Sequence, residues 1–306
     1  MNIVKCIVKS PFGDTIGYGV TLNGVSYQNK AVEELRGITF DNATFVNNKH
    51  PFLRGKPGVN LSSRELKQGV RLYHGSDVVV SHPEYGKGKR NNDYGQGFYT
   101  TMVKDKGEEW ALLKRGKACV CNEYCLNTEG LCIIDLDRYN PLAWIAVVLK
   151  HRGVGSATGI DYSYELDLKK FIEKYSPDLS RADVVIGYRA DDSYFAIVEA
   201  FVAGYYSAGE VISMFHEGYL GRQVFIKSPK AFSSKHLQFV GSYTVNKRNL
   251  GRVQRQDEFV RGKVLREISQ RALEVRRGRY KVKAPTFFDC VDYDYKYDKS
   301  RGGFYV

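Results

Sequence analysis

The chain has 306 residues, of which 43% are hydrophobic, and this is enough apolar material to enclose the core of a globular protein. Its 46 Lys and Arg against 34 Asp and Glu give a formal charge of +12, which predicts attraction to phosphate-bearing partners. No apolar run approaches the roughly 18 residues of a membrane-spanning helix, and the first residues lack the apolar segment of a signal peptide. We therefore expect a cytoplasmic protein without membrane contact.

The first 65 residues consist of short alternating stretches and turns. Asn23-Gly24 separates two such stretches, which is the pattern of a β-hairpin with a two-residue turn. Residues 1–65 are therefore predicted to form a β-rich N-terminal extension.

The middle of the chain alternates between strand and helix patterns. Helices are expected where acidic residues or proline open an apolar periodic segment and basic residues or glycine close it. This gives helices at 105–115, 141–153, 165–175 and 193–204, and strands at 71–75, 97–101, 132–137, 182–190, 221–228 and 237–245. Residues 66–245 are therefore predicted to form one mixed α+β domain.

Four cysteines lie close together in the segment CVCNEYCLNTEGLC, residues 119–132. Four thiolates can hold zinc, but the spacing is not that of a zinc ribbon or finger. The alternative is a pair of strands in which small thiols pack on one face. Without a secretory signal we expect thiols in place of disulfides, and we expect no metal.

Residues 246–306 form a basic segment followed by an aromatic tail. Residues 251–283 carry eleven Lys or Arg against four Asp or Glu, with apolar residues at helical spacing. This pattern predicts an amphipathic basic helix, either docked with a solvated basic face or serving as a surface for phosphates or a protein partner. The sequence does not decide whether the tail after Pro285 is ordered.

Candidate site residues begin at the end of a predicted strand, in LYHGS, where His74, Gly75 and Ser76 follow apolar residues. The next group is DYGQGFYTT, with two glycines before Tyr99, and Trp110 follows eleven residues later on a predicted helix. Two aromatic faces and an exposed backbone suit a flat heteroaromatic ring. A histidine that donates or accepts at neutral pH suits a ribose hydroxyl.

The order LYHGS, DYGQGFYTT and EEWA resembles the ADP-ribosyltransferase superfamily, on the diphtheria-toxin and poly(ADP-ribose) polymerase side. It is most similar to bacterial DUF3990-type proteins, which also share a stretch like residues 183–192. The resemblance covers roughly residues 66–245. It implies a split β-sheet core with flanking helices and NAD as the substrate.

The resemblance also implies roles for individual residues. His74 corresponds to the histidine that bonds ribose hydroxyls, and Gly75 to the glycine whose backbone pairs with the nicotinamide carboxamide. Ser76 adds a polar group beside them. Tyr99 and Trp110 correspond to the two aromatic residues that enclose nicotinamide.

The third signature position departs from the family pattern. A catalytic glutamate is expected at the start of a late strand, and the matching strand GRQVFIK places Gln223 there. Glutamine keeps a hydrogen bond and loses the negative charge that stabilises an oxocarbenium-like ribose. Glu217, expected in a loop, is the nearest rival for this role.

These observations predict an NAD-dependent mono-ADP-ribosyltransferase that modifies a protein or nucleic-acid acceptor, as a bacterial toxin or regulator. Two alternatives remain open. The domain can bind or sense NAD without turnover, or the basic segment 251–283 can make this chiefly a nucleic-acid-binding protein or the docking face for a small inhibitory protein.

Overall fold

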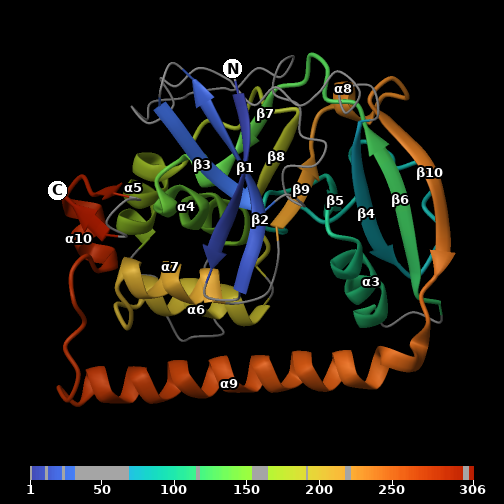
Figure 1. Ribbon diagram of the computed structural model, residues 1–306. Coiled ribbons are helices and arrows are strands. Elements are labelled where there is room, and N and C mark those ends of the chain that lie inside the picture. The colour runs from blue at the N-terminus through green and yellow to red at the C-terminus, as the bar shows by residue number, and fades with distance from the viewer. Residues whose placement is uncertain are drawn as a thin grey trace.

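The computed structural model describes the backbone of residues 2–10, 13–22 and 25–31, and residues 69–114, 118–153, 165–190, 192–217, 222–298 and 303–306 (Figure 1). It confirms a mixed α+β architecture built on several small sheets. Among the described residues, no helix combines the length and the apolar character needed to cross a membrane.

The N-terminal strands form a three-stranded antiparallel sheet of their own. Its strands are β1 (Asn2–Ser10), β2 (Gly13–Leu22) and β3 (Val25–Ala31), in that order. Leu22 lies opposite Val25, which is the register of the predicted hairpin.

Two further sheets form the centre of the molecule. The first is antiparallel, in the order β10 (Leu237–Thr244), β6 (Val120–Leu126) and β4 (Val70–Ser76). The second has the order β5 (Phe98–Thr100), β9 (Arg222–Ile226), β8 (Val184–Tyr188) and β7 (Ile133–Asp135), and only its β7–β8 pair is parallel.

The two sheets meet where β4 and β5 lie side by side. Tyr73 donates its N–H to the carbonyl of Thr101 over 2.7 Å, and Thr101 returns a bond of 2.9 Å. This isolated bridge is the contact that we call the seam. Beyond it β4 continues to Ser76, while the chain after Thr101 turns into a helix.

Helices cover the outer faces of the two sheets, and an apolar layer fills the space between them. That layer includes Leu72 and Tyr124 from one sheet and Val224 and Ile226 from the other. Helix α3 (Lys104–Leu113) covers the three-stranded sheet. The four-stranded sheet is covered by α4 (Pro141–Arg152), α5 (Glu165–Tyr175), α6 (Asp192–Val202) and α7 (Ala208–Glu217).

The predicted basic helix is α9 (Leu250–Arg276), which crosses one side of the molecule in Figure 1. It contacts both α3 and α6, and its Val264 and Ile268 are buried. The helix ends before the predicted residue 283, because Gly278 adopts the left-handed conformation that terminates helices. Helix α9 is therefore docked on the domain through its apolar side.

In the described residues 286–298 and 303–306 the aromatic tail packs on the domain. It forms α10 (Phe287–Asp292), whose Phe287 and Cys290 are fully buried, and then the pair β11 (Lys296–Asp298) and β12 (Gly303–Tyr305). Short segments η2 (Leu136–Arg138), α8 (Pro229–Phe232) and η5 (Lys247–Asn249) complete the described elements.

The cysteine segment does not form the predicted strand pair. Strand β6 belongs to the three-stranded sheet and β7 to the four-stranded sheet, because the intervening chain crosses between them. Residues 119, 121, 125, 132 and 290 are thiols. Within the described part of the chain, no cluster of His, Cys, Asp or Glu is arranged to hold a metal ion.

Candidate active site

His74 lies near the end of β4, directly at the seam. Its Nδ1 is 2.7 Å from the backbone oxygen of Tyr99 on β5. Burial lowers the pKa of His74 to about 4, so the ring is neutral at pH 7. Because a carbonyl only accepts, Nδ1 carries the proton and donates it, and Nε2 is left as an acceptor.

Gly75 allows α3 to lie directly on β4. A Cβ at this position would be 2.3 Å from the Ala111 nitrogen and 2.4 Å from the Gly107 oxygen, both backbone atoms of the helix. The same contact places Trp110 beside the end of the strand. The indole Nε1 of Trp110 is buried without a hydrogen-bond partner among the described residues, and the Arg189 guanidinium lies 5.2 Å from the ring centre.

Tyr99 joins β5 to the loop that precedes it. Its hydroxyl donates to the Gly95 oxygen over 2.6 Å and accepts from the Tyr94 nitrogen over 3.0 Å. The ring packs on Phe225 at 4.7 Å between centres. Burial raises the pKa of Tyr99, so the phenol stays protonated and keeps holding the loop.

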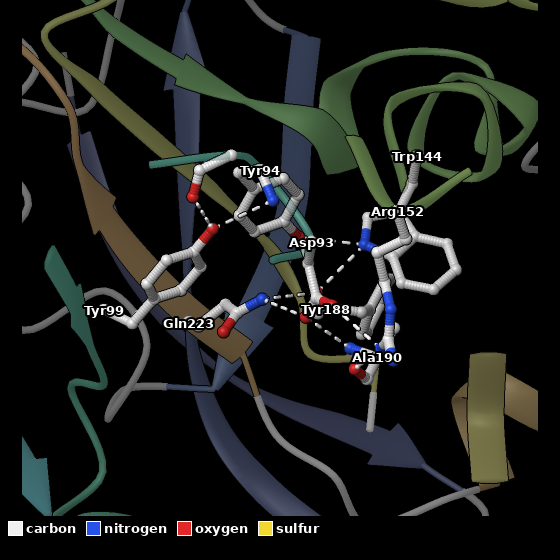
Figure 2. Close-up of polar contacts among 9 residues, drawn as sticks. Asp93, Tyr94, Tyr99, Trp144, Arg152, Tyr188, Ala190 and Gln223 are labelled. Carbon is white, nitrogen blue, oxygen red and sulfur yellow. Dashed lines mark hydrogen bonds and ion pairs between the residues drawn. The ribbon is translucent and has the colours of Figure 1, made fainter. Parts of the chain in front are cut away.

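Gln223 lies on β9, with its side chain on the same face as Phe225, and it is only 3% exposed. Its Nε2 donates to Asp93 Oδ2 over 2.7 Å and to the Tyr188 oxygen over 3.3 Å (Figure 2). The residue is therefore fixed by two acceptors that come from distant parts of the chain.

Asp93 is the site residue that sequence reasoning did not single out. Its buried carboxylate accepts from the Ala190 nitrogen at 2.8 Å, from Arg152 Nη1 at 3.3 Å and from Gln223. Burial raises the pKa of Asp93, and these donors oppose that effect. The available signal was an acid two residues before the first glycine of the loop, in a segment whose glycines already suggested a close approach.

A family profile matches this part of the chain. The family described as "Protein of unknown function (DUF3990)" matches residues 70–239, more than half of the 306 residues. The chain belongs to the DUF3990 family. No match was found among the curated proteins, and none among the solved structures. The matched range contains all of the site residues described above.

In this DUF3990 protein a second set of contacts anchors the loop that carries Asp93. The Tyr94 hydroxyl donates to the Tyr188 oxygen over 2.5 Å and accepts from Trp144 Nε1 over 2.8 Å (Figure 2). Helix α4, which carries Trp144, and strand β8 therefore fix the loop from one side. Tyr99 fixes it from the other.

The structure of the DUF3990 protein connects most of the predicted residues, two pairs directly and the others through intervening residues. His74 contacts Tyr99, and Gly75 lies against the backbone of Trp110. The loop 93–95 joins Tyr99 to Gln223. Gln223 also bonds to Tyr188, and the next residue, Arg189, lies over the ring of Trp110.

Two predicted residues are placed differently. The Ser76 hydroxyl accepts from the Val78 nitrogen at 3.3 Å and lies 3.4 Å from Asp77 Oδ1, so it stabilises a local turn. Glu217 was expected in a loop, and this was wrong, because it is the last residue of α7. The Glu217 side chain lies outside the described residues.

Proposed function

We propose that the protein is an NAD-dependent mono-ADP-ribosyltransferase that modifies a protein or nucleic-acid acceptor. In this reaction the bond between nicotinamide N1 and ribose C1′ breaks, and its electron pair leaves with nicotinamide. The acceptor nucleophile bonds to C1′ and releases its proton. The observation that carries the proposal is the neutral, oriented His74 beside Gly75 at the point where β4 leaves β5.

Hydrogen-bonding groups at this point match the parts of NAD. Nε2 of His74 is an acceptor without a hydrogen bond from the described residues, and it suits a ribose hydroxyl. Backbone N–H and C=O groups alternate between the two edges of a strand. Those of Gly75 therefore face the same edge as those of Tyr73, which bond to Thr101, and they lie two residues further along β4. One donor and one acceptor side by side complement a carboxamide.

Aromatic and charged groups around the seam support the same ligand. Trp110 offers a ring and a buried N–H that an oxygen of a ligand can satisfy. Arg189 adds a cation suited to a pyrophosphate. Two small sheets joined at one isolated bridge also support the split-sheet core of ADP-ribosyltransferases, which the family resemblance implies.

The proposal is tested by incubating the protein with labelled NAD, alone and with a protein and nucleic-acid extract. His74→Gln should reduce nicotinamide release by about 100-fold or more, because an oriented hydrogen bond at the reacting ribose is lost. His236→Gln is the matched control, since the Nδ1 of that buried histidine also lies 2.9 Å from a backbone oxygen, that of Asn127, away from the seam. Equal effects of the two substitutions, or a wild type that neither binds nor cleaves NAD, would refute the proposal.

A second candidate is a domain that binds or senses NAD without cleaving it. It is favoured by the uncharged Gln223 at the position where the resemblance implies a glutamate. Calorimetric binding of NAD without nicotinamide release in any fraction would select it. A third reading, partner or nucleic-acid binding through α9, predicts binding that weakens with salt and survives His74→Gln.

A further inference from the structure

The orientation of the Gln223 amide is fixed by chemistry as well as by packing. Asp93 Oδ2 and the Tyr188 oxygen are both acceptors, so only the amide nitrogen can face them. The other atom, Oε1, therefore points away from Asp93 (Figure 2). Gln223 has a fixed donor side and a fixed acceptor side.

Asp93 is surrounded by donors that suit an ionised carboxylate. Its oxygens receive the Ala190 N–H, the Gln223 amide and the Arg152 guanidinium. A protonated acid would turn its own hydroxyl toward one of these donors, whereas a carboxylate only accepts. The buried anion therefore lies directly behind the amide of Gln223.

We infer that Asp93 supplies the negative charge of this site and acts through Gln223 as a positioning residue. The carboxylate holds the amide so that Oε1 faces a ribose hydroxyl, and its charge favours the positive ribose that forms as nicotinamide leaves. This inference rests on the proposed function, because it takes the ribose of NAD as the group that meets Oε1. It also explains the glutamine, since two ionised carboxylates 2.7 Å apart would repel each other.

The first test needs no NAD and uses Gln223→Glu. Its new carboxyl must share a proton with Asp93, so its folded-state pKa lies above the unfolded value of about 4.3. Stability is then retained at low pH, where the shared proton replaces the lost donor, and is lost as the pH rises through the raised pKa. The other groups facing this pair are Arg152, Arg189 and the phenols of Tyr94 and Tyr99.

The measurement is the thermal midpoint of unfolding between pH 5 and pH 8. We expect the gap between wild type and Gln223→Glu to widen by about 5 °C or more over this range. Gln96→Glu is the matched control, because the Gln96 amide donates to two carbonyls, of Gly86 and Gly88, and meets no carboxylate among the described residues. A gap for Gln223→Glu that stays constant with pH would overturn the pairing.

The second test separates charge from structure. Asp93→Asn should lower kcat for nicotinamide release by about 100-fold with little change in KM, because the charge acts mainly in the transition state. Adding Gln223→Glu to Asp93→Asn returns one negative charge and should recover at least tenfold. Both variants replace the carboxylate that accepts from the Ala190 N–H, so a difference in rate between them does not come from that hydrogen bond. A double variant no faster than Asp93→Asn would overturn the inference.

The outcomes distinguish this inference from the proposed function. If the wild type cleaves NAD and the double variant shows no rescue, only the role of Asp93 is wrong. If the wild type neither binds nor cleaves NAD while the pH-dependent gap appears, the proposed function fails. The pair is then a buried structural unit, and its role toward a ribose is overturned as well.

Discussion

Replacing Gly75 with alanine should displace α3 from β4. The new Cβ would lie 2.3 Å from the Ala111 nitrogen, whereas ordinary contact begins at 3.4 Å. The helix must therefore retreat by about 1 Å, or the strand must bend by as much. Overpacking of this kind costs about 1–3 kcal/mol, and the upper end applies because both of the closest atoms belong to backbone.

For a domain of this size a loss of about 3 kcal/mol corresponds to a thermal midpoint lower by about 6–12 °C, and urea unfolding measures the same loss as a free energy. Gly209→Ala is the control, because nothing lies within 4 Å of its added Cβ and alanine favours the helix α7. It should be neutral or stabilising by up to about 1 kcal/mol. If Gly75→Ala unfolds within 0.5 kcal/mol of wild type, α3 does not rest on β4 as described. Under the proposed function, the retreat should also weaken NAD binding, because it moves Trp110.

Two other predictions concern stability. Burial lowers the folded-state pKa of His74 to about 4, so the unfolded chain binds a proton at this residue first as the pH falls below 6.5. The free energy of unfolding should therefore fall by up to about 3 kcal/mol between pH 6.5 and pH 4. His74→Gln should reduce this pH dependence, as measured by urea unfolding at each pH. An unchanged pH dependence would contradict this reasoning. Phe287→Ala should lower the free energy of unfolding by about 3–5 kcal/mol, because the fully buried ring contacts Phe171 and Phe201. The control Phe288→Ala removes a partly buried ring and should lower it clearly less. Equal losses of stability in calorimetry would mean that the tail does not pack on the domain as described.

Helices with strong local signals were predictable from the sequence. Helix α4 begins at Pro141 after the capping residue Asn140 and ends before Gly153, as those residue types indicate. Helix α5 has the predicted bounds, residues 165–175. Local hydrogen bonding and periodicity determine such segments, so no distant partner is needed to find them.

Helix α7 was missed although its start carries a local signal. The Ser207 hydroxyl accepts from the Glu210 nitrogen, and Glu210 accepts from the Ser207 nitrogen, which is a capping box. The same pattern starts α10, where Thr286 and Asp289 bond reciprocally. Both signals lie within four residues of sequence, so local residue types alone indicate these two helix starts.

The site was only partly predictable, for a physical reason. His74, Tyr99 and Trp110 stand out through order and spacing along the chain. Asp93 does not, because the residues that give it meaning are Ala190 and Gln223, which lie 97 and 130 positions away. A functional role for a buried carboxylate becomes visible only from the donors around it, and here these donors come together only in the folded chain.

Helix α9 has a mechanical consequence for the seam. It is 27 residues long, about 40 Å at 1.5 Å per residue, and it contacts α3 on one side of the seam and α6 on the other. A continuous helix resists bending, so α3 and α6 cannot separate unless one of them loses its hold on α9. The separation of the two sheets at the seam is therefore restrained by a helix that contributes no residue to the candidate site.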